Sequence, residues 1–99
     1  MPYPVQKEDV IWRRVGDTIV VIDEDGLSSH VLNKTASFIW ELCDGKKNID
    51  DIASKINEHF EVSLEDARDD TVETIENLSR AGILINNKGI NYNTRKKAA

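Results

Sequence analysis

Few residues of this 99-residue chain have side chains suited to catalysis or metal binding, and their spacing keeps them apart. Cys43 is the single thiol, and His30 and His59 are the only imidazoles. A nucleophilic enzyme needs a base and oxyanion donors at one site, and zinc needs a set of Cys or His ligands. Cys43 falls on a helical stripe with Ile39 and Trp40, which favours a buried structural thiol. The sequence therefore predicts no enzyme, no cofactor and no metal.

Carboxylates are abundant, with 18 Asp and Glu against 13 Lys and Arg, for a net charge of −5. Between residues 64 and 81 there are two arginines and six acids: Glu65, Asp66, Asp69, Asp70, Glu73 and Glu76. These acids occupy the polar side of a predicted helix, which is typical of a solvated face. A helix with this charge is repelled by phosphates, so we expect no nucleic-acid partner. The alternative of an acidic winged-helix regulator that binds protein or DNA stays open, because three short helices beside a small sheet also describe that fold.

Three strands are predicted at residues 10–15, 18–22 and 28–32. The first two are rich in β-branched and aromatic residues and flank Gly16-Asp17, a hairpin turn. The acidic, Gly-ended stretch 23–26 is the next turn. An antiparallel meander results, with 18–22 in the middle and 10–15 and 28–32 as the two edge strands.

Three helices are predicted to follow, with Asn33, Asn48 and Ser63 as their N-terminal caps. Gly45 and Gly82 end the first and third. The apolar stripe of the third helix contains Leu64, Ala67, Thr71, Ile75 and Leu78. Residues 83–86 are a candidate closing strand, and the segregated order of elements predicts an α+β fold with a winged-helix-like arrangement.

We expect residues 1–86 to form one domain and residues 87–99 to be a disordered basic tail. The tail holds no acid and four bases: Lys88, Arg95, Lys96 and Lys97. No apolar run approaches the roughly 18 residues of a membrane span, and no secretory signal is visible at the start. These features predict a cytoplasmic protein without membrane contact, as a monomer or weak dimer.

The sequence resembles the PqqD family, small proteins named for pyrroloquinoline quinone biosynthesis. The resemblance covers residues 8–86 and rests on order and spacing. It is carried by Leu32-Asn33, Thr35-Ala36, Ile39-Trp40-Glu41-Leu42, Asp44-Gly45, Ile49-Asp50-Asp51-Ile52-Ala53, Phe60-Glu61-Val62, Glu65-Asp66, Leu78 and Ala81-Gly82-Ile83-Leu84.

This resemblance implies a peptide-binding chaperone or adaptor. Such proteins bind the leader of a ribosomally made precursor peptide and present it to a modifying enzyme, usually a radical S-adenosylmethionine (SAM) protein. The leader adds as a strand to the third strand, in the groove beside the third helix, as an exposed edge allows. The peptide-binding residues predicted in this way are Ser28, Ser29, His30, Val31, Leu32, Arg68, Thr71, Val72 and Ile75.

The stretch that leads into the third strand departs from the family pattern. Members dedicated to the quinone cofactor are expected to be more aromatic here and to contain Pro, whereas residues 23–32 read DEDGLSSHVL. The product therefore stays open between pyrroloquinoline quinone and a related peptide-derived compound.

Overall fold

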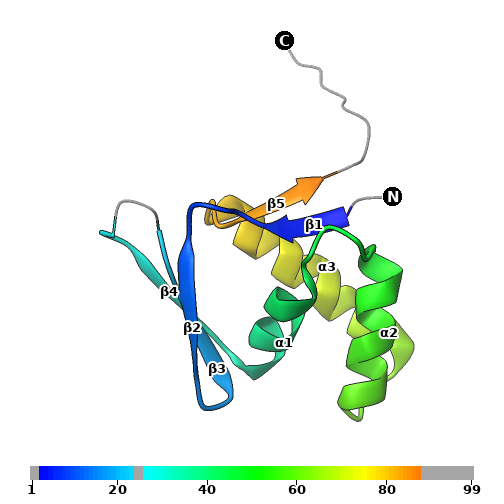
Figure 1. The fold of residues 1–99 in the computed structure, drawn as a ribbon. Coiled ribbons are helices and arrows are strands. Elements are labelled where there is room, and N and C mark those ends of the chain that lie inside the picture. Colours follow the sequence, from blue (N-terminus) through cyan, green and yellow to red (C-terminus); the bar gives the residue numbers. More distant parts are fainter. Residues whose placement is uncertain (1–2, 24–25, 88–99) are drawn as a thin grey trace.

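The computed structural model describes residues 3–23 and 26–87. Two small sheets and three helices make up this part of the chain (Figure 1). In chain order the elements are β1 (Tyr3–Gln6), β2 (Ile11–Val15), β3 (Thr18–Ile22), β4 (Ser29–Leu32), α1 (Lys34–Leu42), α2 (Ile49–His59), α3 (Leu64–Arg80) and β5 (Leu84–Asn87).

The larger sheet is the predicted antiparallel meander, with the strand order β2-β3-β4. Gly16 has a φ of 62° in the turn between β2 and β3, a conformation that glycine adopts without steric cost. The sheet is followed by three helices, which confirms the predicted α+β class and order of elements. β4 is an edge strand, as predicted, because β3 alone pairs with it among the described residues.

All three predicted helix caps are confirmed. The side chains of Asn33, Asn48 and Ser63 accept hydrogen bonds from the backbone N–H groups of Ala36, Asp51 and Asp66. Asp51 also accepts a bond from the backbone N–H of Asn48, so the start of α2 is a reciprocal capping box. These bonds satisfy backbone donors that have no partner inside the helix.

The second sheet pairs the two ends of the described chain, and its β1 strand was not predicted. β1 is antiparallel to β5, with Val5 opposite Ile85. Gly45 donates its backbone N–H to the carbonyl of Pro4, and Gln6 donates its Nε2 to the carbonyl of Trp40. β1 is therefore bound to both β5 and the end of α1, which closes the fold.

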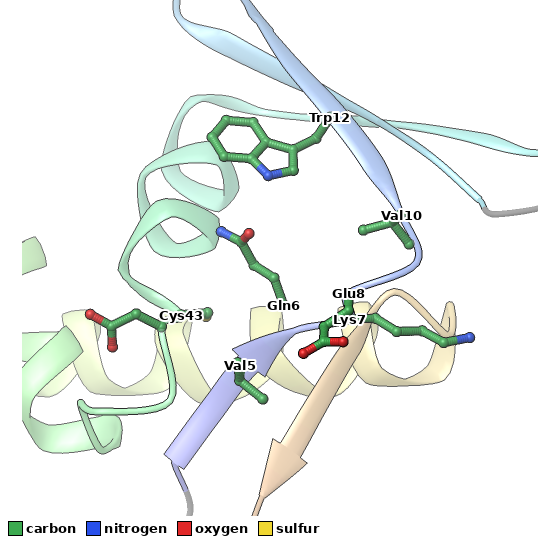
Figure 2. A pocket seen from close by; sticks show the side chains of 8 residues that line it. Val5, Gln6, Lys7, Glu8, Val10, Trp12 and Cys43 are labelled. Carbon is green, nitrogen blue, oxygen red and sulfur yellow. The ribbon is translucent and has the colours of Figure 1, made fainter.

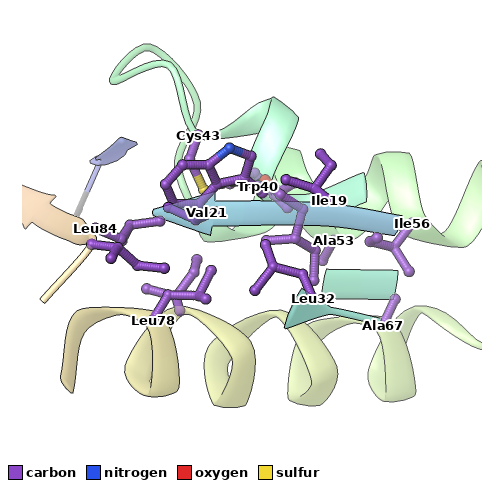
Figure 3. Close-up of a cluster of buried hydrophobic side chains, with 14 residues drawn as sticks. Ile19, Val21, Leu32, Trp40, Cys43, Ala53, Ile56, Ala67, Leu78 and Leu84 are labelled. Atoms are coloured by element: carbon purple, nitrogen blue, oxygen red, sulfur yellow. Dashed lines mark hydrogen bonds between the residues drawn. The ribbon is translucent and has the colours of Figure 1, made fainter. Parts of the chain in front are cut away.

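The core lies between one face of the larger sheet and the helices (Figure 3). Ile19 and Val21 of β3 are fully buried there with Trp40 of α1. Figure 3 shows Leu78 and Leu84 on the α3 side of the same cluster. None of the described helices lies on the other face of this sheet in Figure 1.

The last strand extends one residue past the predicted closing strand at residues 83–86. Asn87, which was assigned to the tail, is the last residue of β5. The predicted basic tail, residues 88–99, lies outside the described residues.

Candidate functional site

One of the two edges of the larger sheet is β4, and its side chains alternate between solvent and core. Val31 is 72% exposed, whereas Leu32 is only 5% exposed and belongs to the core. Val31 lies opposite Val20 of β3, and Leu32 lies opposite Ile19. β4 therefore contributes to the core through one face and presents its other face to solvent.

The backbone of β4 alternates in the same way. Asp23 donates its N–H to the carbonyl of Ser28 at 3.0 Å, and these two residues continue the β3–β4 register one step beyond the pair Ile22 and Ser29. Hydrogen-bonded and non-hydrogen-bonded pairs alternate along an antiparallel ladder. His30 and Leu32 therefore bond to β3, while the N–H and C=O groups of Ser29 and Val31 are directed to the free edge.

On α3, two of the predicted peptide-binding residues are core residues in this structure. Thr71 and Ile75 are 0% and 1% exposed. The Thr71 hydroxyl donates to the carbonyl of Ala67 at 2.7 Å, so its hydrogen-bonding capacity is used within the helix. Val72, next to Thr71, is half-buried.

The predicted residue Arg68 lies apart from the β4 residues. Its guanidinium forms an ion pair with the carboxylate of Asp50 on α2, so this side of α3 faces α2. The structure thus brings Ser28 to Leu32 together along one edge and places Arg68 at a different surface.

A hollow of about 400 Å³ lies at that surface, between α2 and α3. Leu64 lines it and is 54% exposed, although the sequence assigned Leu64 to the buried stripe of the third helix. That assignment was wrong, because Leu64 is the first residue of α3 and lies beyond the buried part of the stripe, which begins at Ala67. The lining residues are Asp50, Ala53, Ser54, Leu64, Glu65 and Arg68.

A second hollow of about 320 Å³ lies near the opposite edge of the larger sheet. Figure 2 shows Gln6 and the side chains of Val10 and Trp12 around it, on β1, the connection to β2, and β2 itself. Cys43 and Asp44, which follow α1, complete the lining. This hollow therefore lies beside β2 and not beside β4, the predicted acceptor strand for the leader.

Cys43, the thiol considered as a nucleophile, is buried in the core. Burial, and secondarily the charge of Asp44, raises the pKa of the Cys43 thiol to about 12. The thiol also donates to the carbonyl of Ile39 at 3.2 Å. A thiol with this pKa is protonated at neutral pH and is a poor nucleophile.

His30 faces a carboxylate that sequence reasoning did not single out. Its Nε2 is 3.6 Å from Oδ2 of Asp23, the residue just after β3. The strand register brings the two residues together across adjacent strands. Their proximity can be predicted from the sequence only when the pairing of the strands is known. Within residues 3–23 and 26–87, no group of three or more His, Cys, Asp and Glu side chains is placed to hold a metal ion.

Comparison with known proteins connects this arrangement to one family. The model of the family described as coenzyme PQQ synthesis protein D (PqqD) matches residues 18–84, from β3 to the start of β5. No curated protein matches the chain by sequence.

Two solved structures share the fold. TbiB1 in complex with the TbiA(beta) leader peptide has a TM-score of 0.73 and 19% identity, over 87% of this chain and 96% of that chain. Lasso peptide synthetase B1 complexed with the leader peptide has a TM-score of 0.74 and 19% identity, over 84% of this chain and 98% of that chain.

Proposed function

Because the chain belongs to the PqqD family, we propose that it is a leader-peptide-binding adaptor. It binds the leader of a ribosomally made precursor peptide and presents that precursor to a modifying enzyme. The two solved structures that share its fold are both complexes with leader peptides. The free edge of β4 is the observation on the molecule itself that carries the proposal.

Strand addition needs an edge with unpaired backbone groups, and β4 provides one. Ser29 and Val31 direct N–H and C=O groups away from β3, and both side chains are exposed. Each added hydrogen bond contributes a net of only about 0.5–1.5 kcal/mol, so several bonds along β4 must act together. The backbone supplies affinity in this mode, and side-chain contacts supply specificity.

The α3 side of the proposed site is acidic. Six carboxylate residues of α3 are exposed, while Arg68 is already paired with Asp50. Such a surface attracts a basic leader through long-range electrostatics and repels nucleic acid. Of the three predicted α3 contacts Thr71, Val72 and Ile75, Val72 is the most accessible, because Thr71 and Ile75 lie in the core.

The modifying partner in this proposal is a radical SAM-type enzyme, as is usual for the family. The adaptor itself supplies no reaction step, in agreement with the buried, protonated Cys43. The product is pyrroloquinoline quinone or a related peptide-derived compound. Since precursors of this kind are made by ribosomes, the encounter takes place in the cytoplasm. None of the helices in the described ranges has the length and apolar character that a bilayer span requires.

Replacing Val31 with Pro tests the strand-addition model. Proline has no N–H, and at Val31 the missing donor is one that faces the free edge. We expect Val31→Pro to weaken binding of the cognate leader peptide by at least tenfold, a loss of about 1.4 kcal/mol, in a calorimetric titration. Val31→Ala is the matched control, because it removes the side chain but keeps the N–H, and it should stay within about threefold of the parent.

Circular dichroism must first show that Val31→Pro is folded. A folded Val31→Pro protein that binds the leader as tightly as the parent would contradict strand addition at β4. A parallel titration with duplex DNA at low salt tests the alternative function. Tight, salt-sensitive DNA binding by the parent protein would favour the winged-helix regulator instead.

A further inference from the structure

One face of the β2-β3-β4 sheet points away from the helices (Figure 1). It carries exposed apolar side chains. Strand side chains alternate between faces, and Ile19, Val21 and Leu32 define the inner one. The side chains of the opposite, outer sheet face are Ile11, Arg13, Val15, Thr18, Val20, Ile22, Ser29 and Val31. None of these eight residues carries a carboxylate.

Apolar side chains on this face are adjacent across the strands. Ile11 lies opposite Ile22, and Val20 lies opposite Val31. Ile11 is 69% exposed, Val15 58% and Val31 72%. Single exposed apolar residues are ordinary on protein surfaces, but a contiguous group over three strands marks an interaction surface.

We propose that the outer sheet face docks the modifying enzyme, through an apolar surface on that enzyme with a carboxylate opposite Arg13. This inference rests on the proposed adaptor function. Arg13 is exposed and sits beside Val20, in the middle of the face. It forms no ion pair within the described part of the chain, in contrast to Arg14, which pairs with Glu41 on the other face. A charge surrounded by apolar groups favours a partner that supplies the opposite charge.

A second copy of this chain fits the outer sheet face poorly. In a face-to-face dimer whose two-fold axis passes by Val20, Arg13 meets either Arg13 or Val31 of the other copy. The first arrangement opposes two positive charges, and the second buries a guanidinium against an apolar side chain. Both leave a charge desolvated without a carboxylate, which is costly.

The outer sheet face is continuous with the edge proposed for the leader. Val31 contributes its side chain to the face and its outward backbone groups to the edge. A peptide strand added to β4 would place every second side chain on the same face. An enzyme bound there would therefore lie next to the presented precursor.

The test separates binding of the enzyme from binding of the leader. The probe is the radical SAM enzyme that modifies the precursor in the proposed function, and its affinity for the adaptor is measured by surface plasmon resonance. The double variant Ile11→Ser/Val15→Ser should weaken enzyme binding at least tenfold and leave leader affinity within twofold of the parent. Ile85→Ser is the matched control, since Ile85 is also an exposed strand residue, 51% exposed, but lies on β5. It should leave both affinities unchanged.

Arg13→Glu tests the charge at the centre of the face. It should weaken enzyme binding at least tenfold, while Arg80→Glu, which makes the same charge change in the last turn of α3, should leave it within twofold. Enzyme binding that survives the double variant or Arg13→Glu would overturn the proposed surface.

Sedimentation of the parent protein tests the rival occupant. A dimer that the double variant dissociates would show that a second copy covers the face, and would also overturn the proposal. If the parent protein does not bind the leader, the adaptor function is contradicted. The affinity for the enzyme is measured separately, so it still tests the docking surface.

Discussion

Both faces of the β2-β3-β4 sheet carry apolar side chains, but those of one face are buried in the folded chain and those of the other are exposed to solvent. Ile19 on the inner face is completely buried beneath α1, while Ile11 on the outer face is 69% exposed. The residue type is the same and the strands are neighbours. The inner isoleucine is explained by folding, because burial of its side chain stabilises the core by about 1.5–3 kcal/mol.

The outer isoleucine has no such explanation within the described chain. An exposed apolar side chain gives little to stability and raises the risk of association. The difference between the faces therefore separates residues that hold the fold together from residues available to a partner. Substitutions that compare the two faces test this division directly.

Trp40→Ala should have the largest effect on stability. The Trp40 ring is 0% exposed, and it packs edge-on against Trp12 with a centroid separation of 6.3 Å. We expect a loss of about 3–5 kcal/mol in the free energy of unfolding by urea, because a large cavity opens where the inner face meets α1. Trp12 remains as the fluorescence reporter. A loss below about 1 kcal/mol would mean that this ring does not hold the inner face to the helix.

Ile19→Ala comes next and is the inner member of the isoleucine pair. Removing three carbon atoms from a closely packed site should cost about 2–5 kcal/mol, with the spread set by how far the surrounding residues relax. The measurement is again urea unfolding, followed by circular dichroism. If Ile19→Ala lowers the free energy of unfolding by no more than a surface substitution does, the inner face does not hold the fold together as described.

Local patterns in the sequence were sufficient to predict most of the fold. The three caps, Asn33, Asn48 and Ser63, act on backbone groups only a few residues away, so short-range reasoning locates each helix start. The central place of β3 followed from TIVVI, the most apolar of the strands. The turn residues Gly16 and Asp17 correctly predicted the β2–β3 hairpin.

Features that depend on distant partners were not predicted. The stretch Tyr3–Gln6 is short and contains Pro4, and it is a strand only because β5 pairs with it from the far end of the chain. Helical periodicity placed Thr71 and Ile75 on one stripe, but it does not say whether that stripe meets a peptide or the core. Likewise, Arg68 was assigned to the peptide site from the resemblance alone, and its pairing with Asp50 depends on how α2 crosses α3.

The Cys43 thiol should make a smaller contribution to the free energy of unfolding, and that contribution depends on pH. Because burial raises the thiol pKa from 9.0 to about 12, the folded state retains a proton that the unfolded chain loses first. Its contribution to stability is complete below pH 9 and is lost as pH rises toward 12, and near pH 9.5 the loss is about 1 kcal/mol. Urea unfolding at pH 8 and 9.5 measures it, with Cys43→Ala as the control that lacks the titrating thiol. Equal pH slopes for the two proteins would contradict the protonated, buried thiol.

Ile11→Ala should have the smallest effect, since the outer member of the pair is already mostly in water. Loss of its cross-strand contact with Ile22 removes a few tenths of a kcal/mol, so we expect a change within about 0.5 kcal/mol. Urea unfolding at two protein concentrations tenfold apart tests this value. If Ile11→Ala costs as much as Ile19→Ala, something covers the outer face in the free protein. A cost that grows with protein concentration would identify the cover as a second copy, whereas a cost independent of concentration would point to another segment of the same chain.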